Sequence, residues 1–115
     1  MSAVFLCRQP GILAGVDCVL RTFAHLDKGV ETVVHSADGQ SVHAGTPVVT
    51  VTGDAHAILA GERVALNLIG RLSGIATLTR AYVDAVKGAR SGPDALIADT
   101  RKTTPGLRAL EKHAV

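Results

Sequence analysis

The chain passes directly from an apolar run into a polar loop at residues 95–106, Ala95-Leu96-Ile97-Ala98-Asp99-Thr100-Arg101-Lys102-Thr103-Thr104-Pro105-Gly106. The short, continuous apolar run at its start favours a strand that is buried on both faces. Leu107 to Val115 follow, with apolar residues on one side, and this spacing predicts a helix. The stretch therefore predicts one βα unit, the building block of parallel α/β folds.

Positive charges and hydroxyls are concentrated in the polar loop and at the start of the next helix. They belong to Arg101, Lys102, Arg108, Thr100, Thr103 and Thr104. Arginine offers a planar fork to a carboxylate or phosphate, and lysine offers a mobile point charge. Ligands of α/β folds bind at the carboxyl ends of strands, where this loop is expected to lie. The loop is a candidate site for a small anionic molecule, and a solvated polar loop is the alternative.

Two helices are predicted upstream of the βα unit, over residues 55–88. Asp54 is a good candidate for the N-cap of the first helix. Ser73-Gly74 interrupts the apolar spacing, and a second helix is expected from Ile75 to about Gly88. A loop is predicted over 89–94.

The first part of the chain, residues 1–54, reads as a small β-rich layer with one helix. Strands are expected over 2–6, 30–34 and 48–52, the last being a β-branched run. The apolar spacing over 16–26 predicts a helix. The fold class is therefore α+β, divided into residues 1–54, 55–88 and 89–115.

Composition excludes several functional classes. With 47% hydrophobic and 19% charged residues, the chain is not a disordered tail. The net charge of +2 and the lack of a Lys/Arg run give no sign of nucleic-acid binding. No apolar run is long enough to span a membrane, and Cys7 and Cys18 lack disulfide or zinc-site spacing. We expect a cytoplasmic protein with free thiols and no metal bound by its histidines.

Several motifs closely resemble those of the quinolinate phosphoribosyltransferases and stand in the same order. They are Glu62-Arg63-Val64-Ala65-Leu66-Asn67, Arg71-Leu72-Ser73-Gly74-Ile75-Ala76-Thr77, Tyr82-Val83-Asp84-Ala85-Val86, Asp99-Thr100-Arg101-Lys102-Thr103-Thr104-Pro105-Gly106-Leu107-Arg108 and Glu111-Lys112-His113-Ala114-Val115. The similarity is dense from Glu62 onward and looser before it. It implies an open-faced α/β sandwich domain (hammerhead-like), a helical linker and the first βα unit of an incomplete α/β barrel.

The resemblance also implies an activity. Such enzymes transfer the phosphoribosyl group of phosphoribosyl pyrophosphate to quinolinate with the help of Mg²⁺, and decarboxylation yields nicotinate mononucleotide for NAD biosynthesis. By resemblance, Thr100, Arg101 and Lys102 bind substrate, and Arg63 reaches into the active site of a partner subunit. A homodimer with shared sites follows, while no catalytic residue is identified.

The chain departs from the family pattern at a few positions. Gly61 stands where the family usually has Ala, and His113 where it often has Tyr. The family's acidic N-terminal segment and its later barrel residues have no counterpart in these 115 residues. We therefore expect an incomplete enzyme, inactive as an isolated chain.

Two alternatives remain open from the sequence. One is the molybdenum-transport relative of the same family, although its equivalent of the Asp99–Arg108 loop is less similar. The other is a non-catalytic dimerising fragment. The turn at Asp38-Gly39 resembles the hairpins of biotinyl and lipoyl carriers, but the lysine that those carriers modify is missing here.

Overall fold

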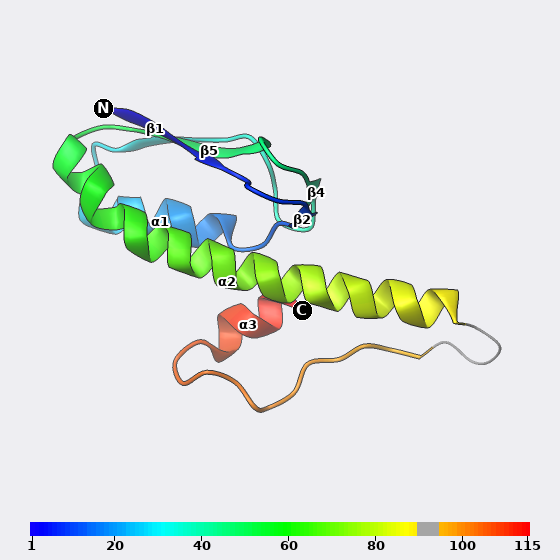
Figure 1. The fold of residues 1–115 in the computed structure, drawn as a ribbon. Coiled ribbons are helices and arrows are strands. Elements are labelled where there is room, and N and C mark those ends of the chain that lie inside the picture. The colour runs from blue at the N-terminus through cyan, green and yellow to red at the C-terminus, as the bar shows by residue number, and fades with distance from the viewer. Residues whose placement is uncertain (90–94) are drawn as a thin grey trace.

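One helix, α2 (Ala55–Gly88), runs along the molecule and carries the other elements on its sides (Figure 1). The computed structural model describes residues 1–89 and 95–115. The molecule measures 56 × 31 × 16 Å, with a radius of gyration of 16.1 Å. A compact domain of this size has a radius of about 13 Å, and the excess comes from α2, whose 34 residues span about 51 Å at 1.5 Å each.

The strands form a small open sheet above α2. β1 (Ser2–Leu6), β5 (Pro47–Thr52) and β3 (Glu31–Val34) pair antiparallel in the order β1-β5-β3. β2 (Gly11–Ile12) and β4 (Ser41–Val42) form a second, two-stranded ribbon. The strands predicted over 2–6, 30–34 and 48–52 are confirmed, and the β-branched run becomes the central strand, where its side chains pack best.

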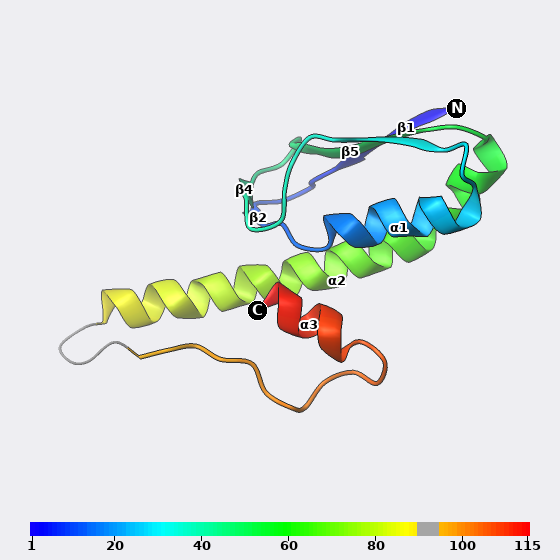
Figure 2. The same ribbon diagram turned by 180° about the vertical axis from the view of Figure 1, so that it is seen from behind.

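The main core lies between the sheet and the helices, with α1 (Val16–Leu26) next to α2 (Figure 2). The predicted helix over 16–26 is confirmed to the residue. Val49 and Val51 of the central strand are fully buried against this layer, and Phe5 meets Phe23 edge to face with ring centroids 6.1 Å apart. The other face of the sheet is bare, with Val4 49% exposed, so the open-faced sandwich is confirmed.

The helix α2 corrects the expected break at Ser73-Gly74, because it is continuous from Ala55 to Gly88. Its N-cap is Asp54 as predicted: the carboxylate accepts hydrogen bonds from the backbone N–H groups of His56 and Ala57. A glycine within a helix costs only about 1 kcal/mol relative to alanine. Burial of Leu72 and Ala76 on either side of the glycine outweighs that cost, so the helix does not stop.

Ser73 and Thr77 act as a partner for the edge of β2. The Ser73 hydroxyl accepts a hydrogen bond from the Ala14 N–H at 3.0 Å and donates to the Ala14 carbonyl at 3.1 Å. Thr77 Oγ1 accepts from the Ile12 N–H at 2.8 Å. Gly11 fits beside this contact because a Cβ there would lie 2.7 Å from Thr77 Oγ1. Two residues one helical turn apart thus satisfy backbone groups of Ile12, the last residue of β2, and of Ala14, two residues further along the chain.

The strand expected over 95–98 is wrong. These residues form no regular structure, and Leu96 is 91% exposed. A parallel strand needs hydrogen-bonded neighbours and covered faces, and residues 1–89 and 95–115 offer no strand beside this run. Of the predicted βα unit only the helix is present, as α3 (Arg108–Ala114), and the described part of the chain forms no closed barrel. Residues 90–94 of the loop predicted over 89–94 lie outside the described residues.

α3 docks on the side of α2 that faces away from the sheet (Figures 1 and 2). Ala114 is buried in a second small core with Ala14, Leu72 and Ala76, and Leu110 packs against it. This packing ties α3 to the same helix that supports the sheet.

Among the described residues, no helix has the length and apolar character needed to cross a membrane.

Removing either hydroxyl of the helix–strand contact is expected to destabilise the fold. Thr77→Val keeps the shape of the side chain but leaves the half-buried Ile12 N–H without its acceptor, at a cost of about 1–3 kcal/mol. Ser73→Ala should lose a similar amount at Ala14. Thr77→Ser, which keeps the hydroxyl, is the matched control and should lose less. Equal free energies of unfolding for Thr77→Val and Thr77→Ser in urea would contradict this role.

Candidate functional site

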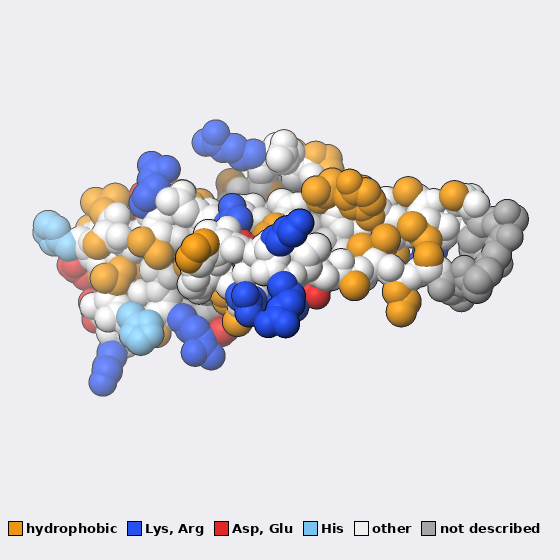
Figure 3. Space-filling view, turned by 90° about the horizontal axis from the view of Figure 1, so that it is seen from below, with side chains coloured by type: hydrophobic (Ala, Val, Ile, Leu, Met, Phe, Trp, Pro, Cys, Tyr) orange, Lys and Arg blue, Asp and Glu red, His pale blue; other side chains and the backbone are white. Residues whose placement is uncertain are grey.

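The Asp99–Arg108 loop and α3 form a positively charged face. Figure 3 shows Lys and Arg side chains gathered near the middle of the face seen from below, which is the side of α3. The exposed basic residues of this segment are Arg101, Lys102, Arg108 and Lys112. This face is the candidate binding surface for an anion.

The loop is shaped by hydrogen bonds within itself. Thr100 Oγ1 accepts from the Lys102 N–H at 3.1 Å, and the Thr104 carbonyl accepts from the Leu107 N–H at 3.0 Å. Gly106 has a φ of 82°, in the left-handed region that favours glycine, where the chain turns into α3. The side chains of Arg101 and Lys102 form no ion pair with any described residue. Their charges are therefore available to a ligand.

The loop is anchored at two points, Asp99 and Thr104. Lys112 Nζ of α3 lies 2.7 Å from Asp99 Oδ2. At the second point an ion pair joins the two helices, because Arg71 of α2 donates to Glu111 Oε1 of α3 from both Nε and Nη2, at 3.1 and 2.7 Å. Arg71 Nη2 also donates to Thr104 Oγ1 at 2.7 Å, while Glu111 Oε2 accepts from the Thr104 N–H at 3.1 Å.

Glu111 is a buried residue whose two carboxylate oxygens both accept hydrogen bonds. It is 9% exposed, although α3 is a short surface helix. Hydrogen bonds from Arg71, then from Thr104, outweigh the effect of burial and lower the pKa of Glu111. The carboxylate is therefore held ionised between α2 and the loop, which is how buried charges persist in proteins.

The structure brings together three of the four residues that the sequence assigned to the site. Thr100, Arg101 and Lys102 are exposed neighbours in the loop. Arg63 is an exposed residue of α2, eight positions before Arg71, which places it about 12 Å along the helix axis from that residue. No hydrogen bond or ion pair joins Arg63 to the loop within residues 1–89 and 95–115.

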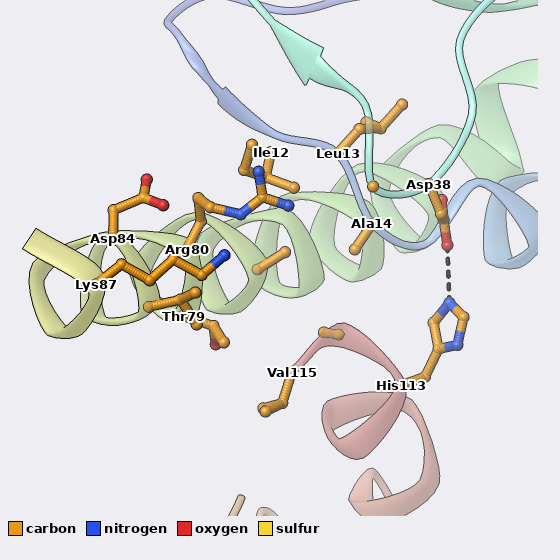
Figure 4. Close-up of a pocket in the computed structure, with 14 residues that line it drawn as sticks. Ile12, Leu13, Ala14, Asp38, Thr79, Arg80, Asp84, Lys87, His113 and Val115 are labelled. Atoms are coloured by element: carbon orange, nitrogen blue, oxygen red, sulfur yellow. Dashed lines mark hydrogen bonds and ion pairs between the residues drawn. The ribbon is translucent and has the colours of Figure 1, made fainter. Parts of the chain in front are cut away.

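A second polar contact lies at the mouth of a cavity of about 550 Å³ between α2, the segment that precedes α1, and α3 (Figure 4). His113 Nε2 of α3 is 2.9 Å from Asp38 Oδ2. The two oxygens of Asp38 also accept from the N–H groups of Gly15 and Val16, each at 3.0 Å. Asp38 thus caps α1 from the turn between β3 and β4, and His113 ties α3 to that cap. Arg80 and Lys87 of α2 line the other end of the cavity (Figure 4).

The capping contacts make Asp38 a stronger acid than an ordinary aspartate. Partial burial raises the pKa of Asp38, but the hydrogen bonds from Gly15, Val16 and His113 outweigh it, and the net direction is downward. The ionised form is favoured because it sits at the positive end of α1 and accepts backbone hydrogen bonds.

Sequence reasoning missed Arg71, Glu111 and Asp38. Arg71 was read as part of a motif without a role, yet it is a charge within an apolar helix, and such a charge needs a partner. The acid that could pair with it, Glu111, is 40 residues away and belongs to a helix that depends on the same contact. Asp38 was read as a turn residue only, because its role depends on a helix that begins 22 residues earlier.

Comparison with protein-family models gives two matches. Residues 1–73 match the model described as quinolinate phosphoribosyl transferase, N-terminal domain. Residues 75–115 match the model described as quinolinate phosphoribosyl transferase, C-terminal domain. The boundary between the two matches falls inside α2.

Curated relatives carry names that agree with these two family models. A probable nicotinate-nucleotide pyrophosphorylase [carboxylating] of Bacillus subtilis is 46% identical over 113 residues, which are 98% of this chain and 38% of that protein. The nicotinate-nucleotide pyrophosphorylase [carboxylating] of Mycobacterium leprae is 46% identical over 94% of this chain and 37% of its own length. The chain thus spans little more than a third of the length of these two relatives.

Solved structures share the fold as well. NadC from Streptococcus pyogenes superposes with a TM-score of 0.88 at 37% identity, over 98% of this chain and 40% of that one. The nicotinate-nucleotide pyrophosphorylase from Francisella tularensis gives a TM-score of 0.88 at 34% identity, over 98% and 39%.

Asp38→Asn is expected to weaken the fold at neutral pH and to reduce its sensitivity to acid. Because the folded pKa lies below the unfolded value of about 3.9, Asp38 contributes stability above that value, and this contribution is lost as pH falls through the folded pKa. The variant should lose about 1 kcal/mol near pH 7, since its amide supplies one acceptor in place of two. Urea unfolding at neutral and acidic pH measures both effects. The same acid slope below pH of about 4 for wild type and variant would contradict the assignment.

Proposed function

Because the chain belongs to the quinolinate phosphoribosyltransferase family, we propose that the protein transfers the phosphoribosyl group of phosphoribosyl pyrophosphate to quinolinate. Pyrophosphate leaves, and loss of carbon dioxide gives nicotinate mononucleotide. The observation that carries this proposal is the anchored loop on which Arg101 and Lys102 are exposed without an ion-pair partner among the described residues. A reaction between two anionic substrates needs fixed cations at that place.

Arg101, Lys102 and Thr100 are the proposed substrate-binding residues of the loop. Quinolinate carries two carboxylates, and phosphoribosyl pyrophosphate carries phosphate groups at both ends. A guanidinium fork binds a carboxylate or phosphate through two parallel hydrogen bonds. A lysine ammonium is a flexible point charge, and it can stay close to the negative charge that develops on the leaving pyrophosphate. Cations held in place before the reaction stabilise the developing charge without a cost of reorganisation.

Mg²⁺ enters the proposal as the companion of phosphoribosyl pyrophosphate. Among the described residues, no group of three or more His, Cys, Asp or Glu side chains could hold a metal ion. The carboxylate that lies nearest to the loop cations in the sequence, Asp99, is paired with Lys112. Mg²⁺ is commonly held by substrate phosphates and one or two carboxylates, so these residues alone form no site for it and no step is assigned to it.

Arg63 is proposed to act in the active site of a second subunit. It is exposed on α2 and has no ion-pair partner within the described ranges, and it stands apart from the loop of its own chain. A two-fold dimer places the same residue of each copy against the other copy. An active site shared between two subunits therefore accounts for Arg63, which is exposed on α2 and has no ion-pair partner among the described residues.

The function is tested by the intact mass of the purified protein together with an assay of nicotinate mononucleotide formation from quinolinate and phosphoribosyl pyrophosphate. The 115 residues have a mass of 11.9 kDa. Activity in a sample of larger mass supports a complete enzyme that contains these residues. A sample of larger mass that binds neither substrate would overturn the proposal.

Mixing two inactive variants is expected to restore activity if the sites are shared. Arg63→Ala and Lys102→Ala each damage both sites of their own homodimer, but a mixed dimer keeps one intact site. With random exchange of subunits, roughly a quarter of wild-type activity should return. The matched control mixes Arg101→Ala with Lys102→Ala, which lie in one loop and cannot complement each other. If both mixtures stay inactive after proven subunit exchange, each site is built from a single chain.

A further inference from the structure

We propose that Arg71 is a positioning residue, which fixes Arg101 and Lys102 for substrate through Glu111 and Thr104. This inference rests on the proposed function, since it names a residue that serves the same site. Arg71 itself belongs to α2 and reaches the loop at Thr104, two residues after Lys102. It acts on the loop only through the groups that it contacts.

The contacts form a closed set of three residues from three elements. Arg71 joins Glu111 through two donors and Thr104 through one, and Glu111 returns to Thr104 through its second oxygen. Each member touches both others, so the side chain of Arg71 or of Glu111 cannot rotate without breaking at least two hydrogen bonds. A guanidinium is planar and offers several donors in a fixed fork, which allows this arrangement.

Arg71, Glu111 and Thr104 together fix one end of a short bridge, which is the loop segment between Asp99 and Thr104. The other end is Asp99, held by Lys112, the neighbour of Glu111 in α3. Only residues 100–103 lie between the two anchors, and they include Arg101 and Lys102. Because both anchors belong to consecutive residues of one helix, the bridge has a defined span. The backbone at Arg101 and Lys102 is thus held in place from both sides, although their side chains form no ion pair with the described residues.

The bridge in turn is fixed to the sandwich. Leu72, the residue after Arg71, is 2% exposed and lies in the small core with Ala14 and Ala114. Arg71 therefore starts from a backbone position that cannot shift without disturbing that core. A comparable exposed pair, Arg21 with Asp17 on α1, has side chains 75% and 69% exposed and contacts no loop. It provides a matched control of the same charge types.

The experiment compares Arg71→Gln, Arg71→Lys and Arg21→Gln in the complete protein. Binding of pyrophosphate and of quinolinate is measured by calorimetry, and hydrogen exchange of the Thr104 amide is followed by NMR. Arg71→Gln should weaken binding about tenfold or more through misplacement of the loop, and the Thr104 amide should exchange faster. Arg71→Lys keeps the ion pair with Glu111 but loses the fork, so its loss should be smaller. Arg21→Gln should change neither quantity.

The outcomes separate this inference from the proposed function. Wild-type protein that binds neither probe overturns the function, and the Thr104 exchange rates still report whether Arg71 holds the loop. Normal binding by Arg71→Gln in spite of a freed Thr104 amide overturns the positioning role. If Arg71→Gln fails to fold, the Arg71→Lys variant decides: unchanged binding overturns the role, and weakened binding with an unchanged melting temperature supports it.

Discussion

The structure depends on one continuous buried stripe along α2. Its first half packs against α1 and the sheet, where Gly61 is essential to the approach: a Cβ there would lie 2.7 Å from the Phe23 ring and 2.8 Å from Leu26. Glycine at position 61 therefore has a steric reason, because any side chain there would force Phe23 and Leu26 to shift. The second part of the stripe, at Leu72 and Ala76, receives α3. Whatever shifts α2 shifts both layers together.

The parts of the fold that the sequence predicts well are those whose signal is local. The helix over 16–26 and the β-branched strand over 48–52 carry their periodicity within a few residues, and each lies where it was expected. The two errors have a common cause. Ser73-Gly74 was read as a break because the backbone partner of the Ser73 hydroxyl, Ala14, is 59 residues away in the sequence. The run over 95–98 was read as a strand because apolar character says nothing of whether neighbours are present.

The same contrast applies to the site. Arg101 and Lys102 could be named from the sequence because a dense cluster of charges and hydroxyls is visible in one stretch, and a family resemblance supports it. Their supports could not be named in this way. Arg71 and Glu111 are separated by 40 residues, and although a charge within an apolar helix needs a partner, the sequence does not say which residue that partner is. Groups that touch substrate often form short motifs, whereas the residues that hold them are defined by the packing of distant elements.

The division between residues that contact substrate and residues that hold the loop explains how a loop with little regular structure can keep a defined position on the fold. A polar stretch such as Asp99–Thr104 has many conformations and loses entropy when it is ordered. Here the ordering comes from the ion pair of Asp99 with Lys112 of α3, and from the contacts of Thr104 with Arg71 of α2 and Glu111 of α3. The side chains of Arg101 and Lys102 form no ion pair with the described residues, so their charges are not consumed by the fold. Anchoring by some charges and recognition by others allows the same loop to be rigid and still available to an anion.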